Sequence, residues 1–264
     1  MISSGMLRSA ALSASLFVVG PAYAATCIGN CGTAAPNGDV TAPPVGGPNY
    51  DFVSTNGGGA GAGQIGGAGG TNGSQFTTSS FSASAGDTLK FAFNYVTSDG
   101  SSSFPDYSFA ELLNGGGHVA WLFTARTVPT GDTSPGQGLP TNDSTLSPLS
   151  STIIPSASNW SALGGTSGGC YSAGCGSTGW ITSIYSIALS DIYQLRFGVT
   201  NFGDSAYDSG LAYAGLTVND VPVEDVPIIG SVPEPATWAM MIVGFGLAGR
   251  AARRRRTAQL LIQA

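Results

Sequence analysis

The sequence predicts an all-β fold, an antiparallel two-sheet sandwich of jelly-roll-like type, between an N-terminal signal peptide and a single C-terminal apolar helix. Short runs of alternating apolar and polar residues, typical of half-buried strands, recur along the middle of the chain. Clusters of Gly, Pro, Asp, Asn and Ser separate these runs. Between residues 25 and 232, no window of about twelve residues has the 3.6-residue period of a helix. Two sheets packed on each other are therefore expected.

The clearest predicted strand is TLKFAFNYV, in which Leu89, Phe91, Phe93 and Tyr95 alternate with smaller or polar residues. Because successive side chains of a strand point to opposite faces, these four residues should line the core. A first short strand is expected at residues 50–54. The other predicted strands are residues 107–113, 118–125, 180–187, 193–199 and 211–218.

Residues 1–24 have the parts of a secretory signal peptide. Arg8 precedes the apolar run AALSASLFVVG, and Ala22 and Ala24 occupy the small-residue positions before a cleavage site. The run is shorter than the roughly 20 residues that a membrane-spanning helix needs. We therefore expect cleavage after Ala24 and export of the remaining chain.

Residues 25–74 form an N-terminal segment that combines two cysteines with a glycine-rich stretch. More than half of residues 56–73 are glycine, the residue that loses most backbone entropy on ordering. We expect a flexible loop here, before the main β-sandwich ectodomain at residues 75–222. A phosphate-binding loop is the alternative, but the stretch lacks the G-K-[ST] sequence of that motif.

The charge pattern argues against nucleic acid as a partner. Only 9% of all residues are charged, against about 25% in average globular proteins. Residues 25–232 contain three basic and fourteen acidic side chains, a formal charge of −11. Nucleic-acid binding requires a surface of Lys and Arg that neutralises phosphates, and the central domain has too few.

The C-terminus carries a second apolar run. After a linker at residues 223–232, Pro-Glu-Pro precedes ATWAMMIVGFGLAG, an arginine cluster follows, and residues 257–264 form a tail. A helix of about fourteen residues spans about 21 Å, less than the roughly 30 Å of a bilayer core. Arginines tend to stay cytoplasmic, which would place the central domain outside the inner membrane. The cluster comprises Arg253, Arg254, Arg255 and Arg256.

Residues 233–256 resemble the PEP-CTERM protein-sorting signal in its PEPxxWAMM form. The resemblance includes Pro233, Glu234, Pro235 and Trp238, followed by the apolar run and the arginine cluster in the order of that family. It implies an inner-membrane intermediate that an exosortase-type membrane protease of a Gram-negative bacterium recognises and cleaves. The product would reach the cell surface or the extracellular matrix. An ordinary proline linker before a single-pass anchor is the alternative.

The central domain also resembles the uncharacterised β-sandwich ectodomains that accompany such signals. The resemblance is carried by SFSASAGDTLKFAFNYVTSDG, DYSFAELLNGG, CYSAGCGSTGW and LRFGVTNFGDSAYDSGLAYAGLTV. It implies a fold and no established biochemical activity.

Four cysteines occur in two close pairs, Cys27 with Cys31 and Cys170 with Cys175. Because the compartment is oxidising, two local disulfides are expected. Three pairings are formally possible. Zinc binding is the functional alternative, but neither spacing is the C-x2-C of a zinc ribbon.

No catalytic motif supports an enzymatic function. His118 is the only histidine, and the sequence has no G-x-S-x-G element that would place a nucleophile beside it. Glu111, the only glutamate of the β body, belongs to a predicted strand and not to a cleft, which argues against a glycosidase-type carboxylate pair. We therefore expect a non-enzymatic protein without a resident cofactor.

Calcium is the one metal that the sequence leaves open. Asp99, Asp106, Asp204 and Asp208 lie in two polar loops, and carboxylates with backbone carbonyls are ligands that Ca²⁺ takes. The alternative is that these residues form turns by bonding to their own backbone.

These observations predict a structural or adhesive protein linked to exopolysaccharide in the cell envelope or its matrix. A carbohydrate-binding module, with or without calcium, is the alternative, because exposed aromatic rings can stack on sugars. Core packing is the other interpretation of the same rings and is favoured for Trp121. The candidate aromatic residues are Trp121, Trp160, Tyr171, Trp180 and Tyr207.

Overall fold

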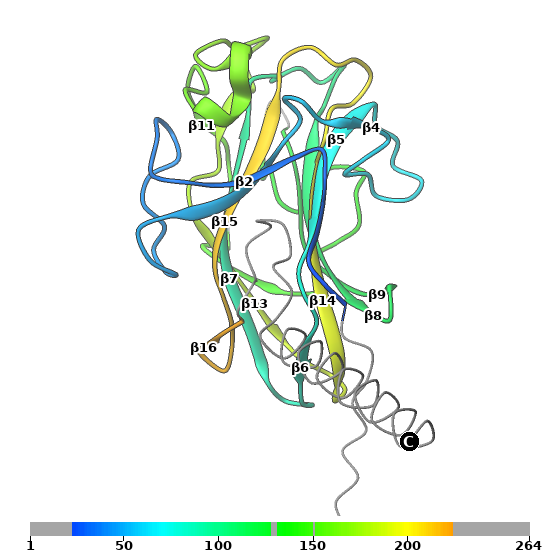
Figure 1. The fold of residues 1–264 in the computed structure, drawn as a ribbon. Helices are drawn as coiled ribbons and strands as arrows, with labels where there is room; N and C mark the ends of the chain where they lie inside the picture. Colours follow the sequence, from blue (N-terminus) through cyan, green and yellow to red (C-terminus); the bar gives the residue numbers. More distant parts are fainter. Residues whose placement is uncertain (1–22, 128–130, 150, 224–264) are drawn as a thin grey trace, which may run out of the picture. The chain divides into compact units, whose positions relative to one another are not determined.

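The computed structural model describes residues 23–127, 131–149 and 151–223, which fold as two antiparallel sheets (Figure 1). All but the last two residues of the predicted signal peptide lie outside the described residues. So do the sorting signal, with the apolar helix expected in it and its arginine cluster, and the tail. The all-β prediction is confirmed for the described part.

The first sheet has the strand order β1-β5-β14-β8-β9, with β4 paired to β5 and β6 paired to β14. Its strands are β1 (Thr26–Ile28), β4 (Gly59–Ala60), β5 (Asn72–Thr77), β6 (Phe81–Ala83), β8 (Tyr107–Asn114), β9 (Gly117–Arg126) and β14 (Asp191–Thr200).

The second sheet has the order β10-β13-β7-β15-β3-β2, with β12 beside β7, β11 beside β12 and β16 beside β15. A short 3-10 helix, η1 (Ser161–Thr166), lies in the loop between β11 and β12. The strands are β2 (Asn30–Ala34), β3 (Tyr50–Ser54), β7 (Thr88–Thr97), β10 (Thr145–Ser147), β11 (Ile154–Pro155), β12 (Gly176–Ser177), β13 (Ile181–Ser186), β15 (Ser209–Val218) and β16 (Val221–Pro222).

Aromatic rings from both sheets form the core between them. Phe93 of β7 stacks on Phe123 of β9 with ring centroids 3.7 Å apart, and Phe197 of β14 stacks on Tyr213 of β15 at 3.9 Å. The four β7 residues predicted to face inward are each no more than 1% exposed. Their burial confirms the alternation that predicted this strand.

The outer face of β7 is also covered, which the alternation did not predict. Phe91 to Thr97 are all buried, because Val96 packs with Trp160 and Val40 in a second apolar cluster outside the sheet. The strand is therefore half-buried only at its start, where Thr88 and Lys90 retain access to solvent.

Residues 25–74 are an integral part of both sheets. Strands β1 and β2 precede the strand at Tyr50–Ser54 that was expected to come first, and β5 crosses the boundary expected at residue 75. The runs that form β1, β5 and β6 are short, and glycine, serine and threonine dilute their alternation. For this reason their sequence carries little strand signal.

The expectation of a flexible glycine-rich loop is wrong, because the loop packs tightly against the first sheet. Ile65 is 4% exposed and lies in an apolar cluster with Tyr107 and Phe109. The Tyr107 hydroxyl donates to the Gly69 carbonyl oxygen at 2.6 Å and accepts from the Ile65 N–H at 3.0 Å. A Cβ on Gly73 would come within 2.2 Å of the Val199 carbonyl oxygen. Glycine is needed there for close packing.

Candidate functional site

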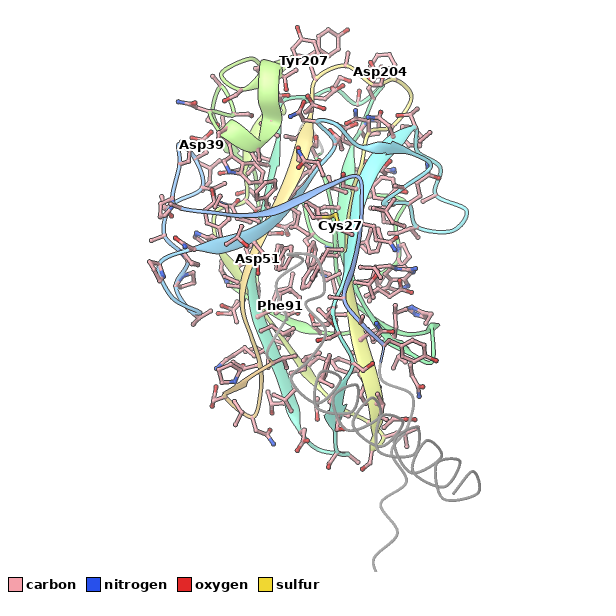
Figure 2. All side chains as sticks on the ribbon, in the orientation of Figure 1. Cys27, Asp39, Asp51, Phe91, Asp204 and Tyr207 are labelled. Atoms are coloured by element: carbon pink, nitrogen blue, oxygen red, sulfur yellow. A yellow bond between two sulfur atoms is a disulfide. The ribbon has the colours of Figure 1, made fainter. Side chains whose placement is uncertain are left out.

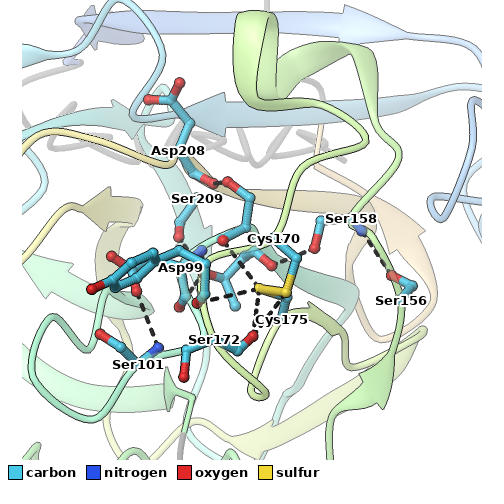
Figure 3. The surroundings of a disulfide bond; sticks show 12 residues. Asp99, Ser101, Ser156, Ser158, Cys170, Ser172, Cys175, Asp208 and Ser209 are labelled. Carbon is cyan, nitrogen blue, oxygen red and sulfur yellow. Dashed lines mark hydrogen bonds between the residues drawn. A yellow bond between two sulfur atoms is a disulfide. The ribbon is translucent and has the colours of Figure 1, made fainter.

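Three loops, residues 98–106, 167–175 and 201–208, lie at the end of the sandwich where β7 and β14 finish and β15 begins. We call this end the loop end. One of them is closed by the disulfide between Cys170 and Cys175, whose Cα atoms are 5.7 Å apart. The N–H of Tyr171 donates to the Ser98 carbonyl oxygen at 2.8 Å, and the Gly100 N–H donates to the Tyr171 carbonyl oxygen at 2.8 Å. The disulfide loop is thereby fixed to the segment that follows β7 (Figure 3).

Both predicted disulfides are confirmed. The second one joins Cys27 of β1 to Cys31 of β2, with Cα atoms 6.2 Å apart. It connects the edge of the first sheet to the edge of the second, because β1 pairs with β5 and β2 pairs with β3. Among the described residues there is no free cysteine.

Phe104, Tyr171 and Tyr207 form a group of aromatic rings on these loops, which we call the aromatic platform. The rings of Tyr171 and Tyr207 are stacked with centroids 5.3 Å apart, and Phe104 lies 6.4 Å from Tyr171. Tyr171 is 45% exposed, whereas Phe104 and Tyr207 are half-buried. Figure 2 shows Tyr207 and Asp204 at the same end of the sandwich. The platform therefore presents aromatic surface to solvent.

The backbone at Tyr207 is held in an unfavourable conformation. Its φ is +59°, in the left-handed region that side chains other than glycine and asparagine rarely adopt. The next residue, Asp208, holds the loop in place: its carboxylate accepts from the Thr55 hydroxyl at 2.9 Å, and its N–H donates to the Thr166 hydroxyl at 3.1 Å. A residue stays in such an unfavourable backbone conformation only where the contacts around it hold it there.

Below the platform, two aspartates are buried. The Asp106 carboxylate accepts from the Ser209 hydroxyl at 2.6 Å and from the Phe202 N–H at 2.8 Å. Burial, with smaller repulsion from Asp99 and Asp204, raises the pKa of Asp106 well above its ordinary value, although both hydrogen bonds oppose the shift. Burial likewise raises the pKa of Asp99. Burial therefore disfavours the ionised form of both carboxyl groups, and most strongly that of Asp106.

The four aspartates predicted as calcium ligands do not all converge. Asp99, Asp106 and Asp204 are close enough to influence one another electrostatically, whereas both carboxylate oxygens of Asp208 accept from threonine hydroxyls. Within the described ranges, no three His, Cys, Asp or Glu side chains are grouped so that they could hold a metal ion. Asp99 and Asp204 have the donor chemistry for Ca²⁺, and calcium binding stays a prediction.

The other candidate aromatics are not part of the platform. Trp160 is fully buried, and its indole N–H donates to the Tyr50 hydroxyl at 2.9 Å. Trp180 is half-buried, and its indole N–H donates to the Thr41 carbonyl oxygen at 3.1 Å. Trp121 packs edge-on against Phe109 at 5.6 Å, consistent with the packing role favoured for it.

A cluster of charged side chains that the sequence did not reveal lies on the outer face of the first sheet. Glu111 of β8 is 2% exposed and accepts hydrogen bonds from Arg196 of β14 and from His118 Nδ1, the latter at 2.8 Å. Strand register brings them together, because Glu111 lies opposite Arg196 in the β8–β14 pair. No local motif encodes a register between strands so distant in sequence.

The described residues form an all-β sandwich with two disulfides, and the C-terminal sequence gives the sorting route of the chain. The PEP-CTERM protein-sorting motif matches residues 231–256. The chain therefore carries the signal that targets exported proteins to an exosortase, a protease of the membrane. Neither a curated protein nor a solved structure matched the chain. In the part that the structure describes, no helix is long and apolar enough to cross a membrane.

Proposed function

We propose that the domain at residues 25–222 is a structural or adhesive component of the cell surface or its exopolysaccharide matrix and has no enzymatic activity. The PEP-CTERM motif at residues 231–256 carries this proposal, because it makes the chain an exported protein that is processed at the membrane. Two disulfides support it, and so does the burial of β7 on both of its faces. Both features suit a protein that must persist outside the cell.

Fractionation of the producing cells tests this proposal. The wild-type protein should be recovered with the outer surface and its polysaccharide, and its mass should show that Arg253–Arg256 have been removed. The double variant Pro233→Ala/Pro235→Ala should remain full-length in the inner membrane, because the prolines keep the cleavage site extended. Wild-type protein that retains the arginines, or a double variant released at normal size, would contradict the sorting route.

The second candidate function is carbohydrate binding, and the aromatic platform favours it. Tyr171 and Tyr207 are stacked and solvent-accessible on loops that a disulfide and the Asp208 contacts hold in place. Rigid rings of this kind offer a flat apolar face with a polar hydroxyl at one end, which suits the C–H face of a sugar.

A pull-down with the matrix polysaccharide of the producing cell tests this second function. Tyr171→Ala and Tyr207→Ala should each lose most of the bound protein. Leu189→Ala is the matched control, because Leu189 is 71% exposed and precedes β14, whereas Tyr207 follows it. Repeating the assay in EDTA and in millimolar calcium tests the calcium prediction, which requires binding only with the metal.

A further inference from the structure

The loops at the end of the sandwich that carries the aromatic platform hold four aspartates that no described ion pair engages. Among the described residues, the ion pairs engage Asp220 and Glu111, at other places in the fold. None of them involves Asp99, Asp106, Asp204 or Asp208. Burial disfavours the ionised forms of Asp99, Asp106 and Asp208, so Asp204 is the carboxylate of this group whose charge a ligand can meet, and no described ion pair cancels it.

One carboxylate oxygen in this group is buried without a partner. Asp99 Oδ1 accepts from the Ser101 N–H at 3.1 Å, whereas Asp99 Oδ2 is buried and makes no hydrogen bond. Asp99 forms a backbone bridge with Tyr171 of the platform, and Figure 3 shows Asp99 beside the loop that the Cys170–Cys175 disulfide closes. Buried oxygens are almost always bonded, and Asp99 Oδ2 is a buried acceptor of this aspartate group without a described donor.

Asp204 is the carboxylate of this group that a ligand can contact from solvent. Asp99 and Asp106 are buried, and Asp208 is bonded to threonine hydroxyls. Asp204 is half-exposed, and its Oδ1 accepts from the Ala206 N–H at 3.1 Å. It follows β14 in the same loop as Tyr207. An aromatic face and a carboxylate are thus offered to solvent within one loop.

We propose that the aromatic platform binds the cationic amino-sugar units of a polysaccharide, with the sugar ring on Tyr171 and Tyr207 and the ammonium group at Asp204. This inference rests on the carbohydrate-binding function proposed above. Three features select this ligand class. Aromatic faces attract cations, a carboxylate accepts charge-assisted hydrogen bonds from an ammonium group, and the local field repels uronic acids and other anionic sugars.

Binding of three hexasaccharides to the full purified chain tests the proposal: glucosamine, N-acetylglucosamine and guluronate, measured calorimetrically at low salt and mildly acidic pH. Glucosamine should bind about tenfold more tightly than its N-acetylated form, and guluronate should not bind. Asp204→Asn should lower the affinity for glucosamine about tenfold and so remove its preference over N-acetylglucosamine. Asp191→Asn is the matched control, because it removes the same charge at the start of β14.

The outcomes separate this inference from the function on which it rests. Equal affinity for the two amino sugars, or the same preference in Asp204→Asn and wild type, would overturn the charge selection while carbohydrate binding stands. A hexalysine peptide that binds as tightly as glucosamine would show attraction by net charge alone and would also overturn it. If no hexasaccharide binds and Tyr171→Ala changes nothing, the carbohydrate-binding function itself fails.

Discussion

Two buried carboxyl groups in this sandwich, those of Glu111 and Asp106, have opposite surroundings. Glu111, on the outer face of the first sheet, is surrounded by Arg196 and His118. Asp106, at the loop end, receives only uncharged donors, the Ser209 hydroxyl and the Phe202 amide. Opposite charges favour the ionised form of a carboxyl group, whereas burial alone favours the neutral form.

The comparison indicates which surface of the protein carries a carboxylate that a ligand could contact. The Glu111 carboxylate is paired with the Arg196 guanidinium and accepts a hydrogen bond from His118, so these side chains on the outer face of the first sheet form a closed network. At the loop end, no described ion pair engages the half-exposed Asp204, and the exposed ring of Tyr171 lies at the same end. The net charge of the domain therefore does not show which surface holds a carboxylate without an ion-pair partner, because that depends on where the few basic residues lie.

The largest expected effect follows from removing the main cation at Glu111. Arg196→Met should lower the free energy of unfolding by about 3 kcal/mol, because a carboxylate that is 2% exposed loses its strongest partner. Urea denaturation of wild type and variant measures it. A loss below about 1 kcal/mol would mean that Glu111 is not dependent on this ion pair.

Two further variants sharpen this test. The double variant Glu111→Leu/Arg196→Met should be more stable than Arg196→Met alone, since replacing both partners leaves no buried charge. His118→Gln should change the stability by less than about 1 kcal/mol, because the His118 side chain is 45% exposed and its partner keeps Arg196.

The second expected effect concerns the disulfide at the loop end. Cys170→Ser/Cys175→Ser should cost about 2 kcal/mol, the loop-entropy contribution of a short closed loop. It should also speed hydrogen exchange at the Gly100 amide, which donates to the Tyr171 carbonyl oxygen. Cys27→Ser/Cys31→Ser is the control, because its loop is of similar length but touches neither Gly100 nor Tyr171. Equal hydrogen exchange at the Gly100 amide in both variants would show that the Cys170–Cys175 disulfide does not hold the platform loop in place.

Local sequence features predicted the parts of the fold that depend on neighbouring residues. The alternation around Phe91 and Phe93 identified β7 and its inward face, and cysteines four and five positions apart identified both disulfides. Tyr171 and Tyr207 were also named as candidates from sequence. Each of these predictions concerns residues that are adjacent in the chain or share one strand.

The remaining features depend on contacts between distant segments. Glu111 meets Arg196 through strand register, and Tyr171 meets Tyr207 because separate loops converge at one end of the sandwich. The glycine-rich loop was expected to be flexible because its composition suggests high entropy. At Gly63 and Gly73, the absence of a side chain instead permits close approach to the backbone of β14. Composition cannot distinguish these two uses of glycine.

The smallest expected effect is on the pH dependence of stability, and it tests the uncharged state of Asp106. Because its pKa is raised in the folded protein, this carboxyl group keeps its proton at pH values where the unfolded chain has lost it. The folded state then binds more protons, so the contribution of Asp106 to stability is present at low pH and is lost as the pH rises through its folded pKa.

Asp106→Asn should remove that contribution, because the amide resembles the protonated carboxyl: its oxygen accepts from the Phe202 N–H, and its NH₂ group donates to the Ser209 hydroxyl oxygen. Between about pH 5 and pH 8, the Tm of the wild type should fall by about 2 to 4 °C more than that of the variant, about 1 kcal/mol for a domain of this size. Asp87, whose pKa is lowered by the Ser84 N–H, contributes a slope of opposite sign. That slope is the same in both proteins and cancels in the comparison. Parallel Tm curves would show that Asp106 is ionised in the folded state, and the loop end would then resemble the Glu111 site more closely than its hydrogen bonds indicate.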